Sequence, residues 1–419
     1  MPDDRPHGFC MPRARRAYTE SPALFEGLSK SERAVASWLL RRGAASQAEL
    51  VVSTALSRPT VHLALSNLGK AGLVKVTPSH QAASGERRRG QLYRLTPRAG
   101  LAVGVEIGRR HITVELVDAG HRQVRTPLNK AIEASADEHP ADVLGQCAAL
   151  VRSALRDTGV GGGVLGIAVG LPQPVTSEGR IGTRTLMPAW ADLDPVAELA
   201  PKLGFAPVHV GNEADFGALG EYVFGAGGGN RDLIYVKLGT GIGAGTILNG
   251  QLHRGASGAA SEFGHITIDF KGRRCPCGNR GCLERYAGGK ALLDEARDAG
   301  LDISSLPDLV QRARSDDMAC RRIITDAAAI IGTALGTLVN LNGPDLIVLG
   351  GSLSAAGELL THPLRAAMEQ AAFPPAARAV SIEAARLDRL ASARGAAAFV
   401  FESFAAQHNL CASRFSLLA

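Results

Sequence analysis

One short segment constrains the fold of this 419-residue chain more than any other. It reads CPCGNRGCLE, at residues 275–284, and it follows the histidine of SEFGH at 261–265. Four potential metal ligands have the spacing H-x9-C-x-C-x4-C: His265, Cys275, Cys277 and Cys282. Three thiolates and one imidazole suit tetrahedral zinc, and four protein ligands make a closed, structural site. Gly278 and Gly281 supply the turns that fold the loop around one ion. The alternative is a redox C-x-C pair, which leaves Cys282 and His265 unused.

The overall composition indicates a globular protein with two or three domains, because 45% of its residues are apolar and 21% charged. No run approaches the ~20 apolar residues that a membrane helix needs. The start of the chain has no apolar segment after its basic residues, so it does not resemble a secretory signal. Seven cysteines, four of them scattered singly, do not make a disulfide framework. We therefore expect a cytoplasmic protein without a membrane segment, and a disordered tail over residues 1–24.

The charge is divided unevenly along the chain. Residues 1–100 carry 16 Lys and Arg against 7 Asp and Glu, a net charge of +9, and the remaining residues carry 30 against 33, a net charge of −3. A basic head on a mildly acidic body suggests that the head meets a polyanion. The alternative is a basic tail that is merely solvated.

Residues 25–98 have the pattern of a winged helix-turn-helix domain. Helices are expected over 29–43, 46–57 and 57–74, followed by two strands joined by the basic loop SGERRRGQ. The third helix would enter the major groove of double-stranded DNA. The candidate DNA contacts are its outer residues and the tip of the loop: Arg58, Thr60, His62, Ser66, Lys70, Arg87, Arg88 and Arg89. The alternative is a winged helix that contacts other proteins.

Residues 99–419 alternate strand and helix with many glycines. LAVGVEIGRRHITVELVD (101–118) and DLIYVKLGTGIGAGTILNGQLHRG (232–255) each read as a strand, a turn and a second strand. Two similar glycine-bearing hairpins in an α/β chain are typical of two-lobed nucleotide-binding folds.

The motifs EFGH (262–265) and CPCGNRGCLE resemble the two hallmarks of the ROK family of repressors, open reading frames and kinases. The resemblance runs from about residue 99 to 405. With a DNA-binding head in front, the arrangement is similar to the xylose and N-acetylglucosamine repressor branch. It implies a two-lobed body with the actin-like ATPase fold of the sugar kinase/Hsp70 type.

The resemblance also implies a sugar site. Its expected residues are Asn212, Glu213, Glu262, His265 and Glu284. Carboxylates accept hydrogen bonds from sugar hydroxyls, and His265 would contact both zinc and sugar through its two ring nitrogens. The alternative is that these glutamates are merely solvated.

Several positions depart from the family's kinases. Glu213 stands where the kinases have an aspartate as general base, and one added methylene misplaces the carboxylate by roughly 1 Å. Glu106-Ile107-Gly108-Arg109-Arg110 replaces the phosphate-binding Asp-x-Gly-Gly-Thr. LGTGIGAG (238–245) is intact, so Gly239, Thr240, Gly241 and Gly243 remain a possible vestigial nucleotide loop. Gln173 and Ser261 stand where glycine is usual near the sugar, and they bear on which sugar fits.

The sequence thus predicts a transcriptional regulator of carbohydrate metabolism, with no catalytic residue assigned. Its expected partners are a double-stranded DNA operator, a sugar or sugar-derivative effector, and further copies of itself in a homodimer or homotetramer. The first alternative is an ATP-dependent hexose kinase with an appended DNA-binding domain. The second is a body that serves only as a dimer scaffold or a dock for another protein.

Overall fold

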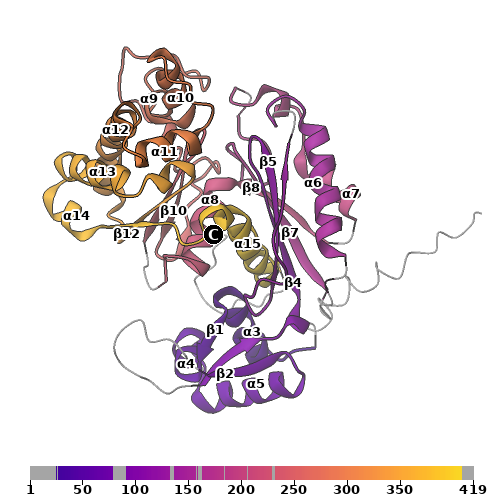
Figure 1. The fold of residues 1–419 in the computed structure, drawn as a ribbon. Coiled ribbons are helices and arrows are strands. Elements are labelled where there is room, and N and C mark those ends of the chain that lie inside the picture. Colours follow the sequence, from indigo (N-terminus) through magenta and orange to yellow (C-terminus); the bar gives the residue numbers. More distant parts are fainter. Residues whose placement is uncertain are drawn as a thin grey trace, which may run out of the picture.

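The computed structural model describes residues 25–407 apart from several short gaps (Figure 1). The gaps are residue 26 and residues 79–90, 133–135, 157, 159–162, 184, 205 and 229–231. The predicted tail over 1–24 and the predicted loop arginines Arg87, Arg88 and Arg89 lie outside the described residues. The described chain forms a small head below two α/β lobes (Figure 1).

Within the described residues, the head contains helices α3, α4 and α5 and a three-stranded antiparallel sheet of order β1-β3-β2. Its elements are α3 (Lys30–Arg42), β1 (Ala44–Ser46), α4 (Gln47–Thr54), α5 (Arg58–Lys70), β2 (Val74–Pro78) and β3 (Gln91–Leu95). This is the order of helices and hairpin that the sequence predicted.

Serine side chains begin all three helices. Ser29 and Ser46 form capping boxes with Glu32 and Glu49, and Ser57 Oγ accepts a hydrogen bond from the backbone N–H of Thr60. The predicted helix starts are therefore confirmed. The second helix ends earlier than predicted, at Thr54, because the next residue is left-handed with φ 55°.

The first lobe is built on a five-stranded sheet of order β6-β5-β4-β7-β8. Its strands are β4 (Leu101–Ile107), β5 (His111–Asp118), β6 (Leu128–Ala131), β7 (Val164–Leu171) and β8 (Val208–Asn212). Strands β4, β7 and β8 are parallel, and β5 and β6 are added antiparallel. Helices α6 (Pro140–Leu155) and α7 (Pro195–Leu203) pack on its outer side (Figure 1).

The second lobe repeats this topology, with the sheet order β11-β10-β9-β12-β13. Its strands are β9 (Leu233–Leu238), β10 (Ile242–Leu248), β11 (Gln251–Leu252), β12 (Leu346–Gly350) and β13 (Ser381–Ala384). Its helices are α9 (Glu284–Ala287), α10 (Gly289–Asp298), α11 (Leu306–Arg314), α12 (Met318–Asn342), α13 (Glu358–Ala371) and α14 (Pro374–Ala379). The same strand order in both lobes confirms the two-lobed fold predicted from the paired hairpins.

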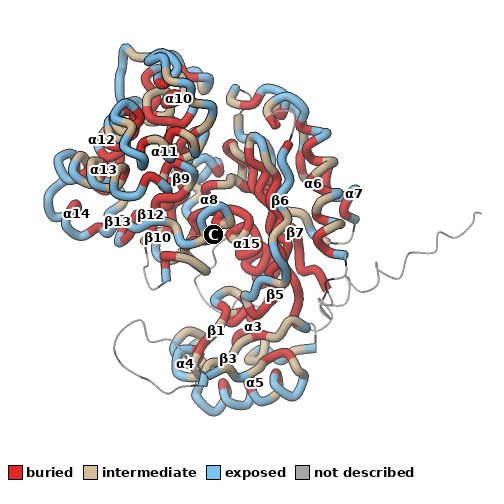
Figure 2. The backbone as a smooth tube through the Cα atoms, viewed as in Figure 1, coloured by how far each residue is buried: buried red, intermediate tan, exposed pale blue. Residues whose placement is uncertain are grey.

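Two helices, α8 (Glu213–Phe224) and α15 (Ala391–Gln407), lie between the sheets (Figure 2 shows them largely buried). The two helices pack so closely that only glycine fits at residue 395 of α15. A Cβ on Gly395 would lie 1.6 Å from the carbonyl oxygen of Phe216 in α8. The residues GNEAD (211–215) end β8 and begin α8. This sets the first turn of α8 at the end of the sheet.

The head and the body share one hydrophobic core. Helix α15 packs against α3 of the head as well as against α8, β4 and β7. The shared cluster includes Val35, Leu39 and Leu68 of the head and Phe216, Phe401 and Phe404 of the body. Polar contacts cross the same boundary: His121 Nε2 lies 2.7 Å from the carbonyl oxygen of Leu40, and Arg41 lies 3.9 Å from Glu402. The hydrophobic core therefore continues across the predicted boundary near residue 98, from the head into the body.

Helix α12 is long and apolar enough to cross a membrane by length and composition alone. However, 56% of that apolar window is buried, and the helix packs against α11 and α13 in the core of the second lobe. A core helix of this kind is weak evidence for a membrane span.

Candidate functional site

The four predicted metal ligands converge in the second lobe. Their donor atoms, one from each of His265, Cys275, Cys277 and Cys282, all lie within 4.8 Å of one another. Two short backbone pairings, Thr267 with Cys282 and Arg274 with Arg280, fold the loop back on itself. Gly278 and Gly281 have φ values of 100° and 66°, as expected for the turns. We call residues 265–282 the knuckle.

The spacing of the donor atoms in the knuckle fits a zinc ion. Cys277 Sγ lies 3.7 Å from Cys282 Sγ, and Cys275 Sγ lies 3.6 Å from His265 Nδ1. Around a tetrahedral zinc ion, two sulfur ligands lie about 3.8 Å apart and a sulfur and a nitrogen about 3.6 Å apart. Burial and the neighbouring thiols raise the pKa of Cys282 to about 12. Thiolates at this spacing therefore need a cation to balance them, so the cluster is able to bind a metal ion.

The knuckle also fixes the carboxylate that follows it. The backbone N–H of Leu283 donates to the carbonyl oxygen of Ile266, and Glu284 then begins α9. Glu284 Oε2 accepts a hydrogen bond from the backbone N–H of Ile242, at 3.2 Å. Its carboxylate thus lies against the glycine loop between β9 and β10.

The other predicted sugar residues lie at the start of α8 and beside the 3-10 helix η3 (Phe263–His265). Strand β10 lies between these two elements and contacts both. On one side Gly264 of η3 packs closely against Ile242, because a Cβ there would lie 2.2 Å from the Ile242 carbonyl oxygen. On the other side Gly243 faces Ala214 of α8. Asn212 is the N-cap of α8: its Oδ1 accepts from the N–H groups of Ala214 and Asp215. Its Nδ2 donates to the carbonyl oxygen of Gln173.

Acidic groups gather between the start of α8 and η3. Burial raises the pKa of Asp215 to about 8, and the pKa of Glu262 rises to about 7 because of burial and the nearby Glu284. Asp215 lies 3.9 Å from Arg254, whose guanidinium also donates to the carbonyl oxygens of Val175 and Thr176. The sequence singled out neither Asp215 nor Arg254, because residues far apart in the chain meet here.

A lysine occupies the end of the first lobe's hairpin, where kinases would bind phosphate and metal. Lys237 Nζ lies 2.5 Å from Glu106 Oε1 and 2.9 Å from Glu213 Oε2. Burial alone would raise the pKa of Glu106, but Lys237 and His111 hold it at about 2. Burial raises the pKa of Glu213, with Lys237 opposing. We call Glu106, Lys237 and Glu213 the lysine cluster; the sequence missed Lys237.

The arginines of this hairpin contact the segment that follows β6. Arg109 pairs with Asp137, and the backbone carbonyls of Arg109 and Arg110 accept from the N–H groups of Ala136 and Ile132, respectively. Arg109 therefore has its charge partner in another segment of the first lobe.

The intact glycine loop is largely committed to the protein itself. Ile242 N–H donates to Glu284, and the carbonyl oxygens of Gly239 and Thr240 accept from the N–H groups of Gly289 and Lys290. A Cβ on Gly241 would lie 2.2 Å from Glu284 Oε2, so the close approach of this carboxylate requires glycine at that position.

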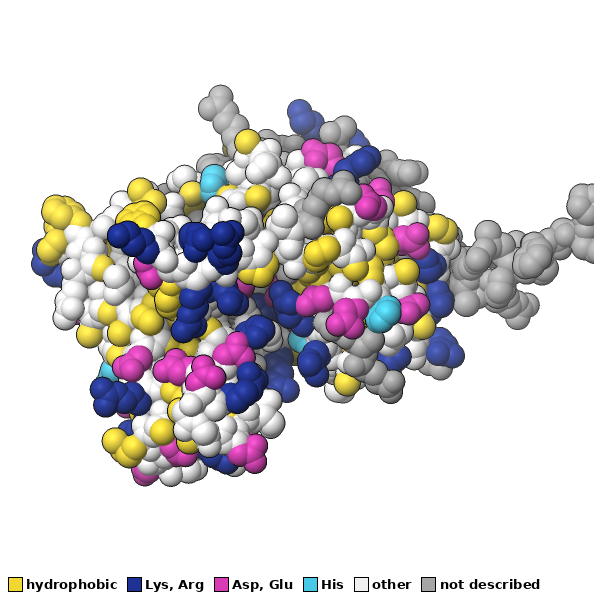
Figure 3. Space-filling view, turned by 90° about the horizontal axis from the view of Figure 1, so that it is seen from above, with side chains coloured by type: hydrophobic (Ala, Val, Ile, Leu, Met, Phe, Trp, Pro, Cys, Tyr) yellow, Lys and Arg dark blue, Asp and Glu magenta, His cyan; other side chains and the backbone are white. Residues whose placement is uncertain are grey.

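In the head, the predicted DNA contacts within the described residues all lie on α5. Arg58, His62, Ser66 and Lys70 are exposed, and Thr60 is partly exposed. Val61, Leu65 and Leu68 point into the core, as predicted. By contrast, basic and acidic side chains are interspersed on the face of the molecule seen in Figure 3.

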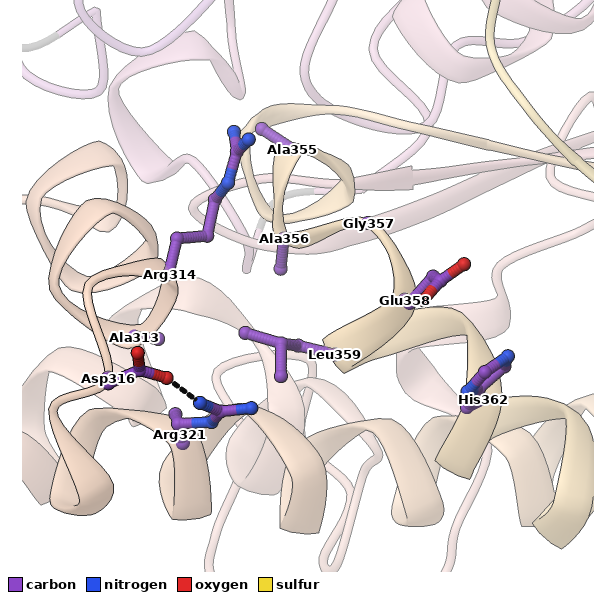
Figure 4. A pocket seen from close by; sticks show the side chains of 10 residues that line it. All are labelled: Ala313, Arg314, Asp316, Arg321, Ala355, Ala356, Gly357, Glu358, Leu359 and His362. Atoms are coloured by element: carbon purple, nitrogen blue, oxygen red, sulfur yellow. Dashed lines mark hydrogen bonds and ion pairs between the residues drawn. The ribbon is translucent and has the colours of Figure 1, made fainter.

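A hollow of about 560 Å³ lies apart from these clusters, between the end of α11, the start of α12 and the start of α13 (Figure 4). Asp316 and Arg321 at its edge pair with each other. Its lining includes none of the predicted site residues, so we do not assign it a role.

Comparison with known proteins agrees with this architecture. The ROK family model matches residues 102–403. The chain is 29% identical over 366 residues to the xylose repressor of Bacillus spizizenii, covering 87% of this chain and 93% of that protein. It is 30% identical to the glucokinase of Streptomyces coelicolor, covering 64% and 86%. A crystal structure of a ROK family transcriptional regulator, a homolog of the E. coli MLC protein, has the same fold, with a TM-score of 0.71, 22% identity, and coverage of 91% of this chain and 100% of that one. The chain belongs to the ROK family.

Proposed function

We propose that this protein is a DNA-binding transcriptional regulator of carbohydrate metabolism, whose body binds a sugar effector. One observation carries the proposal: the head that bears α5 shares a hydrophobic core with α15, and α15 packs along α8. The first turn of α8 holds Asn212 and Glu213. A ligand bound there would act on the same core that supports the DNA-binding helix.

The relatives support the same role. The chain covers most of the length of the xylose repressor, and the solved ROK regulator covers 91% of this chain, including the head. In this proposal α5 reads the major groove through its exposed residues, and Arg58 and Lys70 add phosphate contacts. Two copies of the chain bind two half-sites, which makes a homodimer or homotetramer the working assembly in the cytoplasm.

The effector would bind between the lobes, through Asn212, Glu213, Glu262, His265 and Glu284. The sugar changes operator affinity only to the extent that it binds the DNA-binding state of the protein and the released state with different affinities. In the knuckle, His265, Cys275, Cys277 and Cys282 would hold a structural zinc ion. With four protein ligands, the ion would fix the positions of His265 and Glu284 without taking part in any reaction.

The second candidate function is an ATP-dependent sugar kinase, which the glucokinase relative and the intact glycine loop favour. The lysine cluster opposes it. Lys237 pairs with both Glu106 and Glu213, and this engages the carboxyl groups that would otherwise organise Mg²⁺ or take the proton of a sugar hydroxyl. We therefore propose that phosphoryl transfer has been lost.

The test combines DNA and sugar binding. Fragments selected from the genome by the purified protein are used in fluorescence anisotropy, with and without sugars from a panel of neutral sugars and amino sugars. We expect nanomolar to tens-of-nanomolar operator binding at physiological salt, and a change in affinity with one class of sugar. Thermal shifts with each sugar, with and without ATP–Mg²⁺, run in parallel.

Three results would change the proposal. Failure to bind any DNA fragment selectively would reject the regulator. ADP release that depends on a sugar would restore the kinase. The variant Glu262→Gln tests the sugar site: it should lose the sugar-induced shift, and a melting temperature without sugar equal to that of the wild type would show that it is folded.

A further inference from the structure

Gln173 carries a buried side-chain amide with no partner. Its residue is 2% exposed, and neither Oε1 nor Nε2 has a hydrogen-bond partner among the residues that the structure describes. Buried amides are almost always hydrogen-bonded, because removing them from water without a partner destabilises the folded state. A buried group that breaks this rule beside a candidate site can be satisfied by a ligand that reaches it.

The position of Gln173 ties it to the proposed sugar site. It lies two residues after the end of β7, and its carbonyl oxygen accepts a hydrogen bond from Asn212 Nδ2 at 3.1 Å. The carbonyls of Val175 and Thr176, just beyond it, are held by Arg254. Backbone contacts on both sides therefore fix Gln173 between the ends of β7 and β8 and the acidic groups around Asp215.

The amide defines what the ligand must offer. Nε2 donates and Oε1 accepts, so the pair is satisfied by one group that both donates and accepts, or by two neighbouring groups. Sugar hydroxyls have this property. An amide is also uncharged, so it favours a neutral group at this point in the site.

The surrounding charge excludes an anionic ligand. Four carboxyl groups belong to the site or lie beside it: Glu213, Asp215, Glu262 and Glu284. The two cations that contact them are already engaged, Lys237 by Glu106 and Glu213, and Arg254 by Asp215 and two carbonyl oxygens. Burial already disfavours negative charge here, as the raised pKa of Asp215 shows, and little cationic charge remains free to receive a phosphate group.

We propose that Gln173 is a specificity residue that hydrogen-bonds hydroxyl groups of the effector, and that the effector is a neutral, unphosphorylated monosaccharide. This inference rests on the proposed function, since it names the ligand class of the same site. It explains why the protein keeps an unsatisfied amide in a buried position.

The experiment compares the wild type with Gln173→Met, Gln173→Glu and the control Gln370→Met, which changes an exposed glutamine on α13. The probes are D-xylose, D-glucose and N-acetyl-D-glucosamine, together with the phosphate ester of each. Melting temperatures are measured with and without each probe, and dissociation constants by calorimetry. Methionine is close to glutamine in length and removes both unpaired polar atoms.

Two opposite shifts are expected for Gln173→Met. Without sugar its melting temperature rises by about 1–3 °C, because the unpaired amide is gone. Its affinity for the neutral sugar that binds the wild type falls roughly 10-fold to 100-fold, as expected for two lost hydrogen bonds. Gln173→Glu loses affinity as well, since it adds a charge and removes a donor. Gln370→Met changes neither quantity, and no phosphate ester shifts the wild type.

The failures of the two proposals are distinguishable. If a phosphate ester binds the wild type as tightly as its parent sugar, or if Gln173→Met keeps wild-type sugar affinity, the inference is wrong and the proposed function stands. A fall in the melting temperature of Gln173→Met without sugar would assign Gln173 a structural role and also overturn the inference. If none of the probes binds the wild type, both the sugar-sensing part of the proposed function and the inference fail.

Discussion

The knuckle and the lysine cluster both crowd acidic groups together, three thiols in one and two carboxyl groups in the other, yet they balance negative charge differently. The knuckle brings three thiols and an imidazole within 4.8 Å, with no cationic side chain among its four donors. The lysine cluster has two carboxylates with an ammonium group between them. The first arrangement needs an ion from solution, and the second already contains its counter-ion. The knuckle is therefore able to bind a metal ion, whereas the lysine cluster, which joins the two lobes, already has a cation between its carboxyl groups.

A third arrangement lies between them. Asp215 and Glu262 have less compensation from cations, and burial raises the pKa of each into the range of neutral pH. These groups reduce their charge by keeping protons. The body therefore balances buried negative charge in three ways: a metal ion for the knuckle, an ammonium group for the lysine cluster and bound protons for Asp215 and Glu262. Each can be tested separately.

Removing a ligand of the knuckle should have the largest effect. For Cys277→Ser we expect loss of bound zinc and a fall in the free energy of unfolding of more than about 5 kcal/mol, because structural zinc contributes about 10–16 kcal/mol in small domains. Zinc per chain is measured by elemental analysis, and stability by thermal and urea unfolding. Cys320→Ala is the control, since Cys320 is buried outside the knuckle. Unchanged stability in the metal-free variant would contradict a structural ion.

Removing Lys237 should have the second-largest effect on stability. Lys237→Met leaves Glu106 and Glu213 buried with no ammonium group between them, and we expect a loss of about 3–5 kcal/mol in the free energy of unfolding. Added Mg²⁺ should restore part of it, because two facing carboxylates can bind that ion. Stability is measured by urea unfolding with and without Mg²⁺.

The control for Lys237→Met is Lys290→Met. Lys290 pairs with Asp294 on the surface, with 68% of its side chain exposed, so the expected cost is below about 1 kcal/mol. Equal costs for the two variants would show that the lysine cluster is no more important than a surface ion pair.

The buried carboxyl groups with raised pKa values should have the smallest effect, which is a dependence of stability on pH. The pKa of Asp215 is raised from its ordinary value to about 8 in the folded protein. The folded state therefore binds more protons than the unfolded state between about pH 4 and pH 8, and stability falls as pH rises through this window. For Asp215→Asn we expect the fall between pH 5 and pH 8 to shrink by about 1–3 kcal/mol. Melting temperatures across this range measure it, and an unaltered pH profile would show that Asp215 is ionised throughout.

Much of this protein could be predicted from local sequence. The starts of the head's helices near residues 29, 46 and 57 were predictable, because a capping residue and its partner lie within three positions of each other. The knuckle was predictable for a similar reason, since its ligands lie within 18 consecutive residues and turn glycines separate them. The two hairpins predicted the two lobes because each is a contiguous unit.

The lysine cluster and the acidic groups depended on contacts between distant segments. Lys237 and Glu106 are 131 residues apart, and nothing in either neighbourhood indicates the other. Asp215, Arg254 and Gln173 likewise become informative only when the ends of β7, β8 and β10 meet. The sequence did mark Gln173 as a departure near the sugar, but its unpaired amide is a property of the packed structure.

The sequence by itself determined where the helices of the head begin, which residues can bind a metal ion and that the body has two similar lobes. Tertiary structure decided that head and body share one core, that Lys237 pairs with Glu106 and Glu213, and that the Gln173 amide is buried without a partner among the described residues. Caps, turns and metal ligands act over a few residues, so their signals survive in linear order. Burial and charge compensation depend on which distant groups become neighbours, and only the folded chain fixes that.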